Sequence, residues 1–194
     1  LDIFNKIGFP NKKDEDWKFT DLNSIIKKNF KSVKNNYDFN FDKKIDIINE
    51  FEHNYILLVN GVYKSSDIKF EEDEKVKVQS LKSEDNLRNY SKNNLSNLNK
   101  ALTLGGLDLE IQEDYKCKKP IVIYNYFTSN LDNKIINNSN KIKLNQNSEL
   151  ILIEYNVDHK SKYIKNTFEN LEIKDNSVLK NIVIQKTKSN GYFY

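Results

Sequence analysis

A repeat in the second half of the chain constrains the fold more than any other feature. When Asn147-Ser148 is set over Asn176-Ser177, the apolar positions of residues 142–155 align with those of residues 171–184, at a spacing of 176 − 147 = 29 residues. The aligned pairs are Ile142 with Leu171, Leu144 with Ile173, Leu150 with Leu179, Ile153 with Ile182 and Tyr155 with Ile184. Short apolar runs that recur at a fixed period predict a stacked β-solenoid, because each coil buries one face only against another coil.

Asparagine suits the corners of such a repeat, since it tolerates the left-handed backbone conformation and its amide pairs with a stacked Asn. Leu150 and Ile153 are three residues apart, which one flat strand with a two-residue period does not satisfy, so we expect a corner or bulge between them. Leu107 and Leu109, 35 residues before Ile142 and Leu144, indicate an earlier, looser coil. Two hairpins of an ordinary sandwich, with Asn-Ser turns that agree by chance, are the alternative.

Composition excludes several classes of function. The 194 residues carry 31 basic and 28 acidic side chains, a net charge of +3 that predicts no strong field for nucleic acid or an anionic membrane. Arg88 is the only arginine, so bidentate recognition of phosphate or guanine is nearly absent. No apolar run approaches the roughly 20 residues that span a bilayer. Cys117 is the single cysteine, which excludes an internal disulfide and favours a reducing compartment. We therefore expect a cytoplasmic protein, or a plastid one in a eukaryote.

The first hundred residues predict a mixture of short elements. We expect a charged loop anchored to a core by Trp17 and Phe19, a short helix capped by Asp21, and a helix from Asp42 to about His53. Next come a hairpin with an Asn60-Gly61 turn, a strand over residues 76–81, and a helix from Ser83 that ends at Gly105-Gly106.

No residue pattern predicts catalysis or metal binding. The two histidines, His53 and His159, are far apart in the sequence; we expect His53 at an exposed helix end and His159 in solvent. The flanking lysines could lower the pKa of Cys117, but a surface-loop cysteine is the preferred interpretation over a sulfur-accepting or cluster-ligating thiol. The acidic run 71–74 is interpreted as a solvated loop. We therefore assign no catalytic, cofactor-binding or metal residue.

Several segments resemble the SufB/SufD family, the scaffold proteins of the SUF iron–sulfur cluster assembly system. Gly8-Phe9-Pro10, a charged run and then Glu15-Asp16-Trp17-Lys18-Phe19-Thr20-Asp21-Leu22 resemble the family's N-terminal signature, and the SufD branch most, with Phe19 in place of its Tyr. Other similar segments follow in the family's order: Val59-Asn60-Gly61, Leu98-Asn99-Lys100-Ala101-Leu102, Lys119-Pro120-Ile121 and Tyr163-Ile164-Lys165-Asn166-Thr167.

The repeat and the resemblance together predict a mainly β chain with an α+β cap. Residues 1–104 would form a small mixed helical N-terminal capping domain, and residues 105–194 the first coils of a right-handed parallel β-helix, truncated at the C-terminus. The resemblance implies a non-enzymatic, SufD-like scaffold that pairs with SufB and the ATPase SufC to support iron supply and cluster assembly. The resemblance implies an iron–sulfur cluster in the intact complex and ATP on its SufC subunit. It implies no cofactor for this part of the protein. No functional residue of the family is assigned to a position of this sequence.

Two other functions remain open from the sequence. A β-helix polysaccharide-processing enzyme would need calcium-binding carboxylates beside a basic catalytic residue, but Arg88 is predicted on a helix outside the solenoid. A secreted, surface-binding solenoid would need an upstream signal segment. A homodimer through the β-helix edges is a further possible partnership; nucleic acid and membrane are not expected.

Overall fold

The structure is a computed structural model that describes residues 1–19, 21–30, 46–82, 93–128, 131–158, 162–186 and 192–193. The helices are α1 (Asp2–Ile7), the 3-10 helix η1 (Glu15–Trp17), α2 (Leu22–Asn29) and α3 (Asn94–Leu102). The strands are β1 (Asn54–Val59), β2 (Val62–Asp67), β3 (Val76–Leu81), β4 (Gly106–Ile111), β5 (Ile121–Phe127), β6 (Lys134–Leu144), β7 (Glu149–Asp158), β8 (Tyr163–Ile173), β9 (Val178–Lys186) and β10 (Tyr192–Phe193). None of the described helices has the length and apolar character to span a bilayer.

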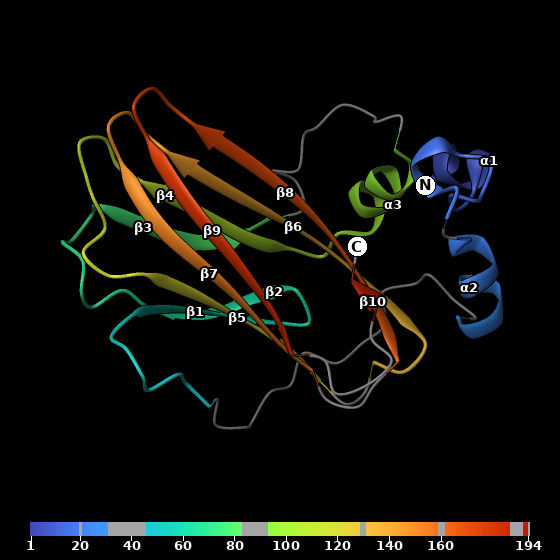
Figure 1. Ribbon diagram of the computed structural model, residues 1–194, viewed down its shortest axis with the longest axis horizontal. Helices are drawn as coiled ribbons and strands as arrows, with labels where there is room; N and C mark the ends of the chain where they lie inside the picture. The colour runs from blue at the N-terminus through green and yellow to red at the C-terminus, as the bar shows by residue number, and fades with distance from the viewer. Residues whose placement is uncertain are drawn as a thin grey trace.

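Two five-stranded sheets of mixed direction pack face to face, with the helices gathered at one end (Figure 1). The strand orders are β2-β1-β5-β7-β9 and β10-β8-β6-β4-β3. From β4 onward, successive strands alternate between the two sheets, and each pairs in parallel with the strand two places later. The fold is therefore mainly β, as the sequence predicted.

The predicted 29-residue register is confirmed. In the pairing of β6 with β8, Ile142 lies opposite Leu171 and Leu144 opposite Ile173. The three predicted pairs of β7 with β9 also lie in register: Leu150 with Leu179, Ile153 with Ile182 and Tyr155 with Ile184. Both pairings are parallel, so the alternative of two independent hairpins is wrong.

The asparagine corners stack as predicted. Asn147 and Asn176 have φ angles of 59° and 58°, in the left-handed region, and Asn176 Nδ2 donates to Asn147 Oδ1 at 3.2 Å. Asn147 Nδ2 in turn donates to Asp114 Oδ1 at 2.7 Å, and Asp114 has a φ of 56°. The corner amides thus form a hydrogen-bonded column along three successive turns.

The expected corner between Leu150 and Ile153 is wrong. Strand β7 is continuous and pairs with β5 and β9 without a shift in register. Leu150 points into the space between the sheets, whereas Ile153 packs in a cluster on the outer face of its sheet. Because apolar residues occupy both faces of the strand, a spacing of three needs no bend.

The predicted pairing of residues 107–109 with the repeat exists, but its register differs from the predicted one. Leu109 lies opposite Ile142 and Ile111 opposite Leu144, so the offset between β4 and β6 is 33 residues rather than 35. The two-residue difference keeps the same face inward, since side chains alternate with a period of two. A row of aliphatic residues therefore crosses β4, β6 and β8 at the end remote from the helices.

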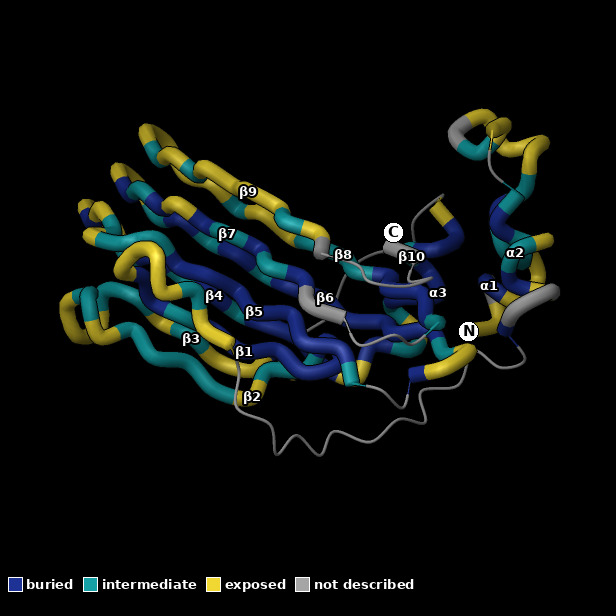
Figure 2. The backbone as a smooth tube through the Cα atoms, turned by 60° about the horizontal axis from the view of Figure 1, so that its bottom comes forward, coloured by how far each residue is buried: buried dark blue, intermediate teal, exposed yellow. Residues whose placement is uncertain are grey.

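Four apolar clusters lie in the described part of the fold, one of them formed by Phe127, Leu131, Ile136 and Tyr163, and burial is greatest in the middle strands (Figure 2). Twelve buried residues fill the space between the sheets. A second cluster lies on the outer face of β1 and β5, and a third joins α2 and α3 to β6 and β8. Trp17 packs against the third cluster as predicted, whereas Phe19 is 89% exposed and does not anchor its loop.

The segment before β1 corrects another expectation. Residues 46–53 form no helix; they lie over the outer cluster, where Ile48 packs. The hairpin of β1 and β2 has its predicted turn, with φ angles of 50° at Asn60 and 80° at Gly61. The β3 strand is also confirmed. Helix α3 ends at Leu102, before the glycines, and the expected helical residues 83–92 lie outside the described residues, as do Asp42 and Arg88.

Candidate functional site

Cys117 is a partly buried thiol in the loop before β5. Burial, with a smaller contribution from the Glu71 charge, raises the pKa of Cys117 to about 12. The flanking lysines therefore do not activate it: Lys116 pairs with Glu149, and Lys118 Nζ lies 2.9 Å from Glu72 Oε1. The expected surface-loop cysteine is instead partly buried and packs against the core between the sheets.

His53 is 7% exposed, so the expectation of an exposed helix-end histidine is wrong. Its Nδ1 lies 3.0 Å from Phe51 O and its Nε2 lies 2.8 Å from the Tyr124 hydroxyl, which also accepts from Ile48 N at 2.9 Å. These contacts fasten the segment before β1 to the outer face of β5. His159 lies outside the described residues, and the described part of the chain contains no group of three potential metal ligands.

Glu71 corrects the interpretation of residues 71–74 as a solvated run. Its Oε2 accepts from the Tyr115 hydroxyl at 2.8 Å and from Lys118 N at 2.9 Å. Its Oε1 accepts from Asn54 Nδ2 at 2.8 Å and from Lys119 N at 3.1 Å. One carboxylate thereby joins the β2–β3 loop to the loop that carries Cys117.

A charged cluster that the sequence analysis did not predict lies between the sheets and consists of Glu154 of β7 with Lys165 and Glu169 of β8. Lys165 is 6% exposed, and its Nζ donates to Asn156 Oδ1 at 3.1 Å. Burial lowers the pKa of Lys165, and the charges of Glu154 and Glu169 oppose that shift. Burial raises the pKa of Glu169, and the neighbouring Glu154 raises it further. The two carboxyl groups thus lie beside one buried ammonium, and we assign the cluster no reaction.

An open edge is formed by β9 and by residues 166–173 of β8, which lie beyond the pairing of β8 with β10. Strand β9 is mostly exposed in Figure 2, and this part of β8 is intermediate to exposed. Leu171 and Ile173 are 45% and 47% exposed, although they stand at the register positions of the buried Ile142 and Leu144. Val183 on β9 is 52% exposed. Aliphatic side chains of a core-facing row thus remain uncovered at this edge.

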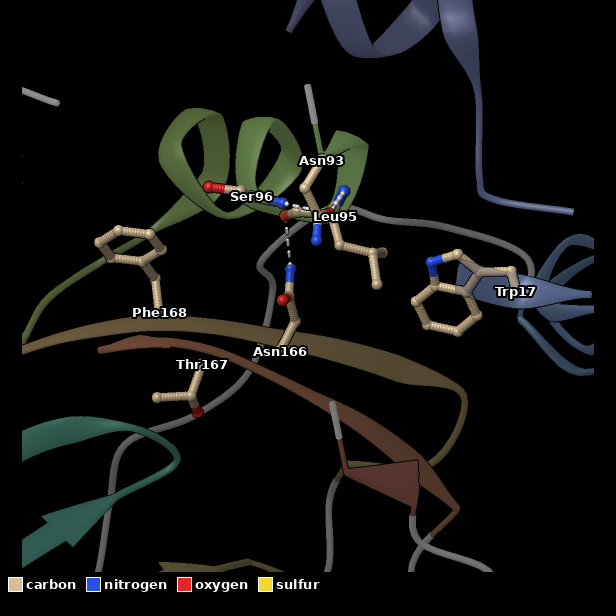
Figure 3. A pocket seen from close by; sticks show the side chains of 7 residues that line it. All are labelled: Trp17, Asn93, Leu95, Ser96, Asn166, Thr167 and Phe168. Carbon is tan, nitrogen blue, oxygen red and sulfur yellow. Dashed lines mark hydrogen bonds between the residues drawn. The ribbon is translucent and has the colours of Figure 1, made fainter. Parts of the chain in front are cut away.

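A hollow of about 390 Å³ lies beside Trp17, between α3 and the outer face of β8. Trp17 and Phe168 stand on opposite sides of it, with Leu95 and Asn166 between them (Figure 3). Asn166 Nδ2 donates to Leu95 O at 3.0 Å and to Asn137 Oδ1 at 2.8 Å. The bond to Leu95 O ties α3 to the sheet beside the hollow, and the bond to Asn137 joins β8 to β6. Asn137 and Asn166 are 29 residues apart, so the repeat period contained this information, although the sequence analysis did not use it.

The comparisons with known proteins agree with the predicted family. The family model described as the SufBD protein N-terminal region matches residues 1–123, which is more than half of the chain. The match covers helices α1, η1, α2 and α3, strands β1–β4 and the start of β5. No curated protein matches the chain.

Proposed function

Because the chain belongs to the SufB/SufD family of iron–sulfur cluster assembly proteins, we propose that it is a non-enzymatic scaffold subunit of the SufD type. The family match over residues 1–123 carries this proposal. The SufD branch is proposed because Glu15-Asp16-Trp17-Lys18-Phe19-Thr20-Asp21-Leu22 is similar to the signature of that branch. The cluster is assembled cargo of the complex in this proposal, and ATP is bound by the partner ATPase.

We propose further that β4–β10 are the first coils of a right-handed parallel β-helix. The support is the alternation of strands between two sheets, the parallel register and the stacked Asn corners. Strand β10 adds to this support because Tyr192 lies opposite Ile164 of β8, 28 residues earlier, at nearly the same spacing. A further coil on β8 and β9 would cover Leu171, Ile173 and Val183.

Hydrogen–deuterium exchange of the protein as expressed in its host tests the proposed coil. A further coil on β9 would protect the amides of residues 178–186 as strongly as those of β7, because both strands would then be hydrogen-bonded on two sides. Fast exchange at alternate amides of β9 would contradict the further coil, since an edge strand leaves every second N–H without a backbone acceptor.

Complex formation tests the proposed scaffold role. The protein is mixed with the SufB and SufC homologues of the same organism, and the complexes are separated by size exclusion with light scattering. We expect a stable assembly that contains all three chains. Failure to bind either homologue, with each protein folded by circular dichroism, would overturn the proposed pairing while leaving the family assignment intact.

A further inference from the structure

The hollow beside Trp17 lies along the unpaired edge of β8. Strand β8 contributes Asn166, Thr167 and Phe168 to its lining, whereas β6, which pairs with the other edge of β8, contributes none of the described lining residues. The pairing of β10 with β8 ends at Lys165, directly before these residues. A strand that extended this pairing would therefore run along the hollow.

The outward positions of β6, β8 and β10 form rows across the sheet, because residues opposite each other in a parallel pair point to the same face. Ile135 and Ile164 form one such row and pack in the cluster with residues of α2 and α3, against which Trp17 also packs. Tyr192 of β10 lies opposite Ile164 and takes the third position of this row. The row that the helices cover is thus continued by β10.

The neighbouring row has no third position in the described part of the chain. Asn137 and Asn166 lie opposite each other, two residues further along their strands, so they face the same side as the first row. Asn166 lines the hollow. The third position of its row would belong to the residue after Phe193, which is Tyr194 and lies outside the described residues. One more residue of β10 pairing would therefore bring a tyrosine side chain to the hollow.

The lining of the hollow suits an uncharged aromatic side chain. None of the described residues that line it carries a charge. Trp17 and Phe168 stand on opposite sides, with Leu95 between them, so a ring placed there would gain aromatic and aliphatic contacts (Figure 3). Asn93 and Ser96 add polar groups at the start of α3, which suit the hydroxyl of a tyrosine.

We infer that the hollow beside Trp17 is the docking site of the Tyr194 side chain, which an extension of β10 along β8 carries there. The ring lies between Trp17 and Phe168, and its hydroxyl points to the first turn of α3. The contact joins the N-terminal segment that carries Trp17 to the C-terminal side of the repeat, across most of the chain. It depends on the pairing of β10 with β8, and it requires neither the further coil over β9 nor the scaffold role.

Quenching of tryptophan emission by acrylamide in the full chain tests the inference. Emission excited at 295 nm reports on the hollow alone, because Trp17 is the only tryptophan of the 194 residues. Tyr194→Ala should raise the quenching constant about twofold and shift the emission to longer wavelength, because one side of the indole becomes open to water. Tyr194→Phe keeps the ring and should leave the quenching constant close to that of the unmodified protein.

A matched control and a second measurement assign the effect to the hollow. Tyr155→Ala removes a partly buried tyrosine from the outer face of the other sheet and should leave the quenching of Trp17 unchanged. Circular dichroism verifies that each variant is folded. In a separate protein, Tyr194 is replaced by the photoreactive p-benzoylphenylalanine, and mass spectrometry identifies the residues to which it cross-links. We expect intramolecular cross-links to Trp17, Leu95 or Phe168.

Two results would overturn the inference. Equal quenching constants for folded Tyr194→Ala and the unmodified protein would show that Tyr194 does not cover Trp17. Cross-links from position 194 only to residues away from the hollow, or to a second molecule, would show that the side chain docks elsewhere. Neither result bears on the further coil, which the amide exchange of β9 decides separately.

Discussion

Gly106 is the position where the architecture leaves least room for a side chain. It is the first residue of β4 and lies opposite Leu81 on one side and Ser139 on the other. A Cβ added at Gly106 would lie 1.6 Å from Ser139 O, whereas real Cβ atoms essentially never approach within 3.0 Å. The Gly106→Ala variant must therefore separate the backbones of β4 and β6 by about 3.0 − 1.6 = 1.4 Å.

The cost of that separation has two components. Overpacking of a fitted core costs about 1–3 kcal/mol. Separation also weakens ladder hydrogen bonds around Gly106, worth about 1 kcal/mol each. We expect Gly106→Ala to lower the free energy of unfolding by about 3–5 kcal/mol. With a urea m-value of about 2 kcal/mol/M, the midpoint should fall by about 1.5–2.5 M.

The neighbouring glycine provides the control. A Cβ at Gly105 would meet Leu81 O at 3.4 Å and the Val62 methyl groups at 3.8 and 3.9 Å, which are tolerable contacts. Both substitutions remove the same freedom from the unfolded chain, an effect of about 0.4–1 kcal/mol, so the difference between them isolates the clash. Urea unfolding followed by circular dichroism gives both midpoints. Midpoints within about 0.5 M of each other would refute the reasoning.

Three further predictions rest on other contacts. Glu71→Ala should lower the free energy of unfolding by about 2–3 kcal/mol, because four donors lose a charged acceptor, whereas the exposed Glu74→Ala should change it by less than about 0.5 kcal/mol; equal urea midpoints would contradict this. Burial raises the pKa of Cys117 from its ordinary value of 9.0 to about 12, so the contribution of the buried thiol to stability is fully present below pH 9 and is lost as the pH rises towards 12. The urea midpoint should therefore fall less between pH 8 and pH 10.5 in Cys117→Ala than in the unmodified protein, and iodoacetamide should alkylate the folded protein at pH 8 at least tenfold more slowly than the urea-unfolded chain; rapid alkylation of the folded protein would be inconsistent with this. Asn147→Val should cost about 2 kcal/mol in urea unfolding, because its φ of 59° disfavours a β-branched residue, and Asn147→Gly should cost less; the reverse order would contradict the argument.

The sequence was sufficient to predict the part of the repeat that lies near the corners. There the inward residues are aliphatic, as at Ile142 and Leu144, and the turn positions are Asn or Asp, so the hydrophobic period and the corner geometry agree. The register of β6 with β8 and of β7 with β9 follows from those positions alone. No Asn-Ser pair follows β4, so the predicted register of β4 with β6 was two residues in error.

The candidate site could be predicted only in part. Trp17 was recognised as an anchor from its place among charged residues, and the family from the same segment. The hollow beside Trp17 depends on where α3 lies on the sheet. Asn99 of α3 helps to set that position, because its Nδ2 donates to Asn138 O and Asn166 O at 2.8 and 2.7 Å. Buried asparagine bonded to distant backbone carbonyls leaves no periodic pattern, so one sequence cannot place it.

The expected corner between Leu150 and Ile153 was wrong because the helix-proximal part of β7 turns apolar residues outward and polar residues inward. Ile153 and Tyr155 are apolar but face outward, where the segment before β1 lies over their sheet, while the polar Glu154 and Asn156 face inward beside Lys165. A strand with a two-residue period is expected to turn its apolar residues towards the core. The outer face of β7 is covered as well, so apolar residues stand on both of its faces, and their spacing was interpreted as a corner. The interior therefore changes along β7, from aliphatic residues near the corners to polar residues beside Lys165, and an apolar cluster of Phe127, Leu131, Ile136 and Tyr163 follows at the helix end. A buried ion cluster costs desolvation energy that an aliphatic row would not, so hydrophobic periodicity alone does not predict it.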